Sequence, residues 1–283
     1  MKKKILLPTD FSMNSWNAMN YARTLFKNEE CEFYILNAFE SKFYTTDSMM
    51  VPEPGEKNYE DAKAKSKENL EKELSRLILK EDNKKHIYYT ISMYNSVLGA
   101  IRELVEQKDI EIIVLSNKGK SNASNTVFGS KTIDVMEKIR NCPVLVVPYN
   151  LIFKKPNEIV FPTNFKTPFK RRELNILYEF VRITNSKLRI LHINQKKSLS
   201  ESQLNNKELL EDILEGLDYS FHWMEKIDIQ IGLQNFVQTR GSEMITFINK
   251  KHAFFSSVFS YPMVKYLGHY SKIPVLVMHD LRN

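Results

Sequence analysis

Short apolar runs alternate with longer amphipathic stretches along the first half of the chain. The stretches place apolar residues three and four positions apart, which is the spacing of one helix face. They predict helices over residues 12–26, 96–107 and 130–140, and a charged helix around Leu70, Leu74, Leu77 and Ile78. The runs between them predict buried strands over residues 4–8, 32–38, 86–93, 111–116 and 144–147.

Strands that alternate with helices are typical of a parallel sheet. Because the apolar runs are continuous, we expect the strands to be buried on both faces of that sheet. Five strands and four helices in this order predict a doubly wound α/β unit. The segment over residues 41–55 contains Pro52, Pro54 and Gly55 and is predicted to be a loop.

The same pattern occurs twice in the chain. Residues 4–12 read KILLPTDFS and residues 158–166 read EIVFPTNFK, while the two halves close on CPVLVV (142–147) and IPVLVM (273–278). The second half is predicted to have strands over residues 158–161, 188–193, 218–224, 243–248 and 275–278, and helices over residues 169–184, 200–216, 228–239 and 262–270. A repeat of this length predicts two tandem doubly wound domains, residues 1–149 and 156–283, each with a five-stranded parallel sheet flanked by helices.

Composition indicates a folded protein that does not cross a membrane. The 283 residues are 42% apolar and 27% charged, which is ordinary for a globular protein. No apolar run reaches the ~18 residues that a membrane-spanning helix needs. The basic N-terminus is followed only by Ile5-Leu6-Leu7 before Pro8, so we expect no secretory signal and a cytoplasmic protein.

Cysteines, histidines and net charge narrow the possible chemistry. Cys31 and Cys142 lie beside or within apolar strands, and we expect them to be reduced, buried thiols. None of the six histidines pairs with another at a metal-ligand spacing, so no metal site is predicted. The net charge of +7 is scattered and no aromatic-basic array accompanies it. We therefore do not expect nucleic acid as a partner.

A candidate binding site follows the first strand. In an open parallel sheet, ligands bind outside the carboxyl ends of the strands, where the strand order reverses. Asp10 comes just past the first strand, after Pro8 and Thr9. Its carboxylate can accept hydrogen bonds from a ribose hydroxyl or an adenine amino group. The alternative interpretation is that Asp10, with Ser12, only caps the helix that follows.

A second candidate segment follows the fourth strand. It reads Ser116-Asn117-Lys118-Gly119, then nine residues, then Gly129-Ser130-Lys131-Thr132. Glycine lets a backbone approach phosphates closely, and the N–H groups of a helix N-terminus favour an anion. Lys131 and Thr132 add a charge and a hydroxyl. The alternative is a loop that ends in a glycine turn and binds nothing.

Taken together, these motifs resemble the universal stress proteins, in the tandem form that has two such domains in one chain. Gly119, the nine-residue gap and Gly129-Ser130 match the family's signature Gly-x2-Gly-x9-Gly-Ser/Thr, and the resemblance extends over essentially the whole chain. It implies a Rossmann-like fold of the adenine nucleotide alpha hydrolase type. It also implies an adenine nucleotide, usually ATP, in the first half, with Mg²⁺ only as the companion of the phosphates.

The resemblance also assigns roles to individual residues. It places Asp10 and Ala38 near the adenosine, and Gly119, Gly129, Ser130 and Thr132 around the phosphates. Pro8, Thr9 and Lys131 complete the predicted site. One position departs from the family's pattern, because the first signature glycine is Ser116. A serine there adds a Cβ atom where the backbone passes close to the ligand, or it contacts the ligand itself.

The second half lacks this signature. Lys251 aligns with Gly119, Ser260-Tyr261 aligns with Gly129-Ser130, and Asn164 replaces Asp10. We therefore expect a structural copy that holds no nucleotide. Two alternatives concern the loop that follows its fourth strand. In the first alternative, the loop binds another anion or an acidic partner through Lys250, Lys251 and His252. In the second, a cluster of aromatic residues forms a docking surface instead of packing internally. The cluster consists of Phe254, Phe255, Phe259 and Tyr261.

The resemblance finally predicts how the halves meet and what the protein does. Single-domain members pair through their last strands, so residues 144–147 and 275–278 are expected to form an intramolecular pseudo-dimer, with a further homodimer possible. The leading hypothesis is a nucleotide-binding stress-response protein that regulates a protein partner. The alternative is an interaction scaffold without nucleotide. No base or nucleophile accompanies the site, so we predict a binding protein with no catalytic residue rather than an enzyme that cleaves at a nucleotide α-phosphate. Slow ATP hydrolysis that accompanies binding is the alternative left open.

Overall fold

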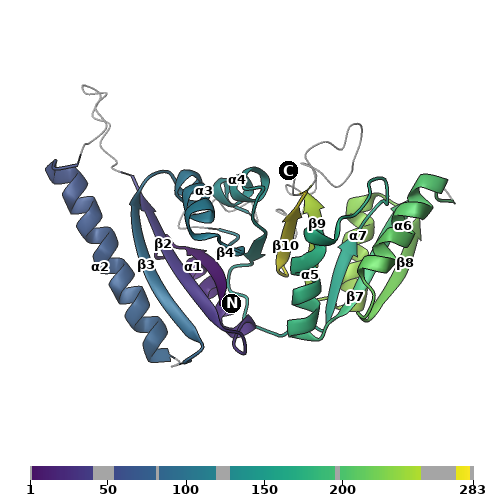
Figure 1. Ribbon diagram of the computed structural model, residues 1–283, viewed down its shortest axis with the longest axis horizontal. Coiled ribbons are helices and arrows are strands. Elements are labelled where there is room, and N and C mark those ends of the chain that lie inside the picture. Colours follow the sequence, from purple (N-terminus) through teal and green to yellow (C-terminus); the bar gives the residue numbers. More distant parts are fainter. Residues whose placement is uncertain are drawn as a thin grey trace, which may run out of the picture.

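The computed structural model describes residues 2–40, 54–80, 83–118, 128–194, 198–249 and 272–280. Strands and helices alternate through the described residues of both halves, as the sequence predicts (Figure 1). The helix predicted over residues 262–270 lies outside the described residues. The first half contains β1 (Lys3–Pro8), α1 (Met13–Leu25), β2 (Cys31–Phe39), α2 (Lys57–Lys80), β3 (His86–Tyr94), α3 (Val97–Lys108), β4 (Ile112–Ser116), α4 (Ser130–Lys138) and β5 (Val144–Val147). The second half contains β6 (Glu158–Pro162), α5 (Arg171–Thr184), β7 (Lys187–Asn194), α6 (Glu201–Ile213), β8 (Tyr219–Glu225), α7 (Ile229–Arg240), β9 (Met244–Asn249) and β10 (Val275–His279).

All of these strands belong to one sheet. Its ten strands run in the order β3-β2-β1-β4-β5-β10-β9-β6-β7-β8. Each half contributes five strands that pair in parallel, in the same relative order. The halves join where β5 and β10 pair antiparallel, with Leu145 opposite Leu276. The α/β fold is confirmed, and the predicted pairing of the two last strands is present.

Helices cover both faces of the sheet. One apolar cluster lies between the sheet and helices α1, α2, α5 and α6, and it contains Leu7, Phe33, Phe161 and Phe180. The other lies between the sheet and helices α3, α4 and α7, and it contains Leu6. Neighbouring strand residues such as Leu6 and Leu7 point to opposite faces, which is why the strands read as continuous apolar runs. Both clusters include residues of both halves.

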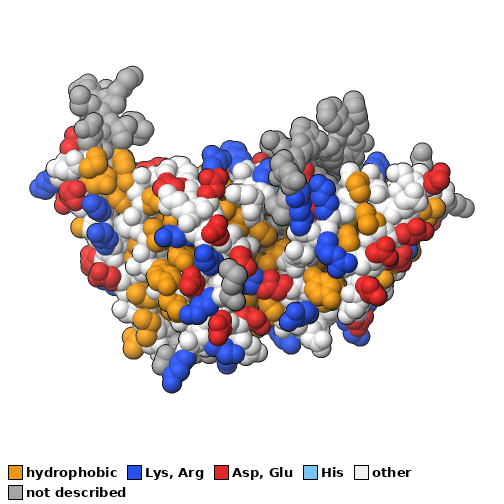
Figure 2. All heavy atoms as spheres, in the orientation of Figure 1, with side chains coloured by type: hydrophobic (Ala, Val, Ile, Leu, Met, Phe, Trp, Pro, Cys, Tyr) orange, Lys and Arg blue, Asp and Glu red, His pale blue; other side chains and the backbone are white. Residues whose placement is uncertain are grey.

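Two further predictions concern the interior and the surface. Cys31 and Cys142 are both buried and free, as predicted. On the face drawn in Figure 2, Lys and Arg side chains are interspersed with Asp and Glu side chains rather than gathered by sign. None of the described helices combines the length and the apolar character that crossing a membrane requires.

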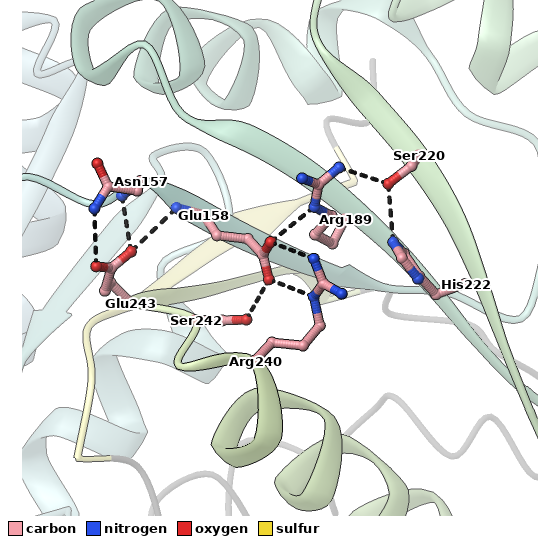
Figure 3. A network of polar contacts seen from close by, with 8 residues as sticks. All are labelled: Asn157, Glu158, Arg189, Ser220, His222, Arg240, Ser242 and Glu243. Atoms are coloured by element: carbon pink, nitrogen blue, oxygen red, sulfur yellow. Dashed lines mark hydrogen bonds and ion pairs between the residues drawn. The ribbon is translucent and has the colours of Figure 1, made fainter.

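A network of ion pairs and hydrogen bonds links residues near the amino ends of the strands in the second half (Figure 3). The carboxylate of Glu158, at the start of β6, accepts hydrogen bonds from Nε of Arg189 at 2.8 Å and from both Nε and Nη2 of Arg240 at 2.8 Å. Ser242 Oγ donates a further bond to it at 2.7 Å. Burial by itself would raise the pKa of Glu158, but the arginine and serine hydrogen bonds outweigh it and lower this pKa to about 2.

The linker and the N-terminal strand tie the halves together. Asn17 of α1 donates from Nδ2 to the carbonyl of Leu151 at 2.9 Å. Phe153 packs edge-on against Tyr21 of α1, with ring centroids 4.9 Å apart. Lys3 Nζ forms an ion pair with Glu179 of α5 at 2.8 Å, which crosses from one half to the other.

Candidate functional site

A cavity of about 400 Å³ opens at the carboxyl ends of β1, β2 and β4. The sheet order reverses between β1 and β4, and this is where doubly wound sheets bind ligands. Nine of the ten site residues predicted from sequence line this cavity, and the tenth, Gly119, lies outside the described residues. The nine are Pro8, Thr9, Asp10, Ala38, Ser116, Gly129, Ser130, Lys131 and Thr132.

The turn after β1 holds Asp10 at the edge of the cavity. Phe11 has a positive φ of 61°, a conformation that is uncommon for a residue other than glycine. Two side chains hold this turn, because Thr9 Oγ1 accepts from the N–H of Phe11 at 3.0 Å and Asp10 Oδ1 accepts from the N–H of Ser12 at 3.1 Å. Ser12 is the N-cap of α1, accepting from Ser15 N at 3.2 Å. The capping role thus belongs to Ser12, while Asp10 shapes the turn and lines the cavity.

A buried polar chain supports this turn from behind. Asn37, at the end of β2, donates from Nδ2 to the carbonyl of Thr9 at 2.8 Å. Its Oδ1 accepts from Ser66 Oγ of α2 at 2.7 Å, and Ser66 in turn accepts from Ser92 Oγ of β3 at 2.7 Å. Each buried amide and hydroxyl in this chain therefore has a partner, and the chain fixes the turn against the sheet.

Helix α4 directs its N-terminus at the cavity. Its N-cap is Gly129, whose φ of −69° and ψ of 153° are extended and open to any residue. Glycine has no side chain that could accept from the first N–H groups of the helix, so these donors are available to an anion. The N–H of Gly129 itself donates to the carbonyl of Asn117 at 2.7 Å. A Cβ atom at Gly129 would lie 3.8 Å from that oxygen, which is ordinary contact.

Ser116, which departs from the family signature, makes a contact within its own loop. Its Oγ donates to the carbonyl of Lys118 at 2.6 Å. Thr132 Oγ1 donates to the carbonyl of Ser116 at 3.1 Å and is buried. The Ser116 hydroxyl hydrogen is therefore used within the segment after β4, and that of Thr132 connects the first turn of α4 to the end of β4. Both hydroxyls keep only their oxygen lone pairs as acceptors for other groups.

The inner part of the cavity is apolar. It is walled by residues at the ends of β2 and β4 and on the inner faces of α3 and α4, which sequence reasoning did not single out. Such a slot suits a flat apolar ring, while the outer part offers the Asp10 carboxylate, the Lys131 ammonium and the N-terminus of α4. The amphipathic pattern of α3 was the signal that could have found part of this wall. The additional lining residues are Ser15, Leu36, Val97, Ile101, Leu115 and Val135.

The second half repeats the turn but has a larger side chain at the position of Ala38. Phe165 has a φ of 54°, and Thr163 and Asn164 hold the turn by the same two hydrogen bonds, at 3.2 and 3.0 Å. The strand registers place Ile193 where the first half has Ala38. Ile193 is buried, and its Cδ1 would lie 3.0 Å from a Cβ atom at Gly232 of α7. The larger side chain thus packs tightly against the helix that corresponds to α3.

A histidine replaces the buried amide in the second half. His192 occupies the register position of Asn37. Its Nδ1 lies 2.9 Å from the carbonyl of Thr163, to which it donates, and its ring stacks on Phe165 at 5.2 Å between centroids. Burial lowers the pKa of His192, so the ring is neutral at pH 7. The segments predicted to form the loop after β9, including Lys250, Lys251 and His252, lie outside the described residues.

Comparison with known proteins agrees with this architecture. Residues 1–148 match the family model described as the Universal stress protein family. A universal stress protein of Methanocaldococcus jannaschii is 30% identical over 163 residues, which covers 52% of this chain and 95% of that protein.

Two solved structures are similar over nearly their full length. The crystal structure of a universal stress protein from Archaeoglobus fulgidus aligns with a TM-score of 0.70 and 15% identity, covering 97% of this chain and 95% of the other. That of a functionally unknown protein from Pseudomonas aeruginosa aligns with a TM-score of 0.65 and 11% identity, covering 98% and 92%. These two show that the fold of both halves is shared. Since the family match spans just over half of the residues, this chain belongs to the universal stress protein family.

Proposed function

We propose that this protein binds ATP in its first half and regulates a protein partner in the cytoplasm according to that occupancy. In this proposal, residues 1–149 form the nucleotide-binding domain and residues 156–283 form a degenerate domain. The observation that carries it is the convergence of residues from β1, β2, α3, β4 and α4 on one cavity of about 400 Å³ at the switch point of the sheet. That cavity combines an apolar slot, a carboxylate and an uncapped helix N-terminus, which is what a nucleoside phosphate requires.

Each part of the nucleotide has a matching part of the site. The adenine ring fits the apolar slot near Ala38, and burying the ring there removes its apolar surface from water, which favours binding. The ribose hydroxyls are donors for the carboxylate of Asp10. The phosphates fit the N-terminus of α4, where the N–H groups after Gly129 and the ammonium of Lys131 favour negative charge.

Magnesium is expected only together with the phosphates. Within the described parts of the chain, no group of three His, Cys, Asp or Glu side chains gathers in a way that would hold a metal ion. Mg²⁺ prefers to keep several waters and to bind through substrate phosphates plus one or two protein oxygens. The ion would therefore neutralise phosphate charge rather than occupy a cage built by the protein.

The second half is proposed to hold no nucleotide. Ile193 fills the slot that Ala38 leaves open, and Asn164 lacks the charge of Asp10. An adenine ring would have to displace a buried side chain that already packs against α7, which costs the packing energy of that side chain. The degenerate half then contributes sheet and core rather than a second ligand.

The decisive test is Gly129→Leu. The backbone at Gly129 is extended and a Cβ atom fits at 3.8 Å from its nearest neighbour, so the fold should be retained. The longer side chain covers the first turn of α4, and ATP binding measured by calorimetry should be lost. The matched control is Gly129→Ala, which adds only the Cβ atom and should bind more tightly than the leucine variant.

Two outcomes would contradict the proposal. One is equal ATP affinity in the wild type and in Gly129→Leu, because the phosphate site would then lie elsewhere. The other is the absence of any nucleotide by mass spectrometry of denatured protein, together with no thermal shift on adding ATP. The second outcome would favour a scaffold that works through its surface alone.

A further inference from the structure

Helix α4 forms hydrogen bonds with other parts of the chain at both ends. At its C-terminal end the partner is a residue of the second half. Its first turn, from Ser130 to Thr132, lines the candidate nucleotide site. Its last turn faces β9 and β10 across the junction between the halves. There, Asn249 Nδ2 donates to the carbonyl of Met136 at 3.2 Å, and this contact is buried. A side chain of the degenerate half therefore touches the helix that the nucleotide site depends on.

This contact satisfies a backbone group that the helix cannot satisfy itself. The last four carbonyls of a helix have no partner within it. In α4 the carbonyl of Val135 receives the N–H of Ile139 at 3.1 Å. The next carbonyl, that of Met136, receives the amide of Asn249. Asn249 thus supplies a C-terminal cap from the other half of the chain.

A second link lies beside the first. Arg140, just past α4, donates from Nη2 to both the carbonyl of Asn249 and the carboxylate of Asp280. Asn249 is 5% exposed, and the side chains of Arg140 and Asp280 are largely shielded from water. A shielded ion pair of this kind constrains position more firmly than one in free solvent. The segment after α4 is therefore anchored to the ends of β9 and β10.

The repeat makes this role specific to the second copy. Asn249 occupies the register position of Asn117, the residue after β4. Asn117 uses its Oδ1 within its own half, accepting from the N–H of Tyr149 at 2.8 Å. The copy that lost the nucleotide signature thus uses the equivalent asparagine to cap a helix of the copy that kept it.

We propose that Asn249, beside the ion pair of Arg140 with Asp280, is a positioning residue for the nucleotide site of the first half. This inference rests on the proposed function. The helix has only nine residues, and a helix this short is marginal without tertiary contacts. Its first-turn N–H groups can hold phosphates at a fixed distance from Asp10 only if the helix keeps its place. The second half is then required for nucleotide affinity although it binds no nucleotide itself.

The experiment removes the cap without touching the site. Asn249→Ala deletes the donor, and Asn249→Leu replaces it with an apolar side chain of similar size, which separates loss of the bond from loss of volume. With one helix-capping hydrogen bond removed, we expect the Kd for ATP to rise roughly threefold to tenfold. Amide hydrogen exchange in α4, measured without ligand, should quicken by a similar factor.

The matched control is Glu179→Gln. It breaks the ion pair with Lys3, which also crosses the junction but involves α5, on the opposite face of the sheet from α4. We expect this variant to keep both the Kd for ATP and the exchange of α4 unchanged. An equal effect in Glu179→Gln would overturn the inference, because general loosening of the junction would then explain the result.

The remaining outcomes separate the inference from the proposed function. If the wild type binds ATP and both Asn249 variants bind it equally well, the inference fails while the proposed function stands. If the wild type binds no ATP, the proposed function fails, and the exchange rates alone decide whether Asn249 holds α4. If amide hydrogen exchange in α4 is then unchanged in both Asn249 variants, the inference fails as well.

Discussion

Ala38→Ile should close the nucleotide site of the first half by copying the second half into it. Ala38 lines the apolar slot, and the matching position of the second half holds Ile193, buried against Gly232. Isoleucine is favourable in a strand, so this substitution should not disturb β2. An adenine ring would then lose its place between the ends of the strands and α3.

The size of the effect follows from the apolar area involved. A ring that buries about 100 Å² in the slot gains about 2.5 kcal/mol at about 25 cal/mol per Å². Losing this contribution raises the Kd for ATP by about 70-fold. We expect the free energy of unfolding to stay within about 1 kcal/mol of the wild type, because the added carbons enter space that is open in the first half.

Isothermal titration calorimetry with ATP measures the affinity, and urea unfolding followed by circular dichroism measures the stability. The control is Ala64→Ile, which adds the same atoms on the exposed side of α2 and should leave the Kd unchanged. An unchanged Kd in a folded Ala38→Ile protein would refute the assignment of the slot to the adenine ring.

Other predictions concern the second half and the thiols. Glu158→Gln should lower the free energy of unfolding by about 3 kcal/mol at pH 7, as expected from the lowered pKa of Glu158. That stabilisation is complete above the carboxyl's unfolded pKa and is lost as the pH falls from about 4 to about 2, so acid titrations of the two proteins should converge there; a constant difference down to pH 2 would argue against it. Burial raises the pKa of Cys31 to about 12 and also raises that of Cys142. A thiol reagent at pH 8 should therefore label neither cysteine until the protein is unfolded, and rapid labelling of the native protein would contradict the burial of these thiols.

Much of the fold is visible in the sequence because its signals are local. Continuous apolar runs mark the strands, and Ser12 and Ser96 mark helix starts as N-caps. Thr9 and Asp10 indicate the turn after β1, because their side chains accept hydrogen bonds from the backbone N–H two residues later. The repeated motifs mark both closing strands, while the pairing of β5 with β10 is predicted only from the resemblance to the universal stress proteins.

The features that the sequence does not reveal depend on strand register and on contacts between residues far apart in the sequence. Ile193 is recognised as the counterpart of Ala38 only when β6 and β7 are aligned as β1 and β2 are. The walls of the slot, such as Val97 and Ile101, come from a helix whose distance from the first strand is set by packing. The cap by Asn249 joins residues more than one hundred positions apart, and no local pattern announces it.

The single sheet has a consequence for assembly. In separate chains, pairing of last strands is a bimolecular equilibrium that dilution reverses. Here the linker between β5 and β6 is docked on α1, through Asn17 and Tyr21. The partner strand is thereby present at an effective concentration in the millimolar range. The pairing of β5 with β10 should therefore persist at any protein concentration, and among the described strands only β3 and β8 keep an unpaired edge.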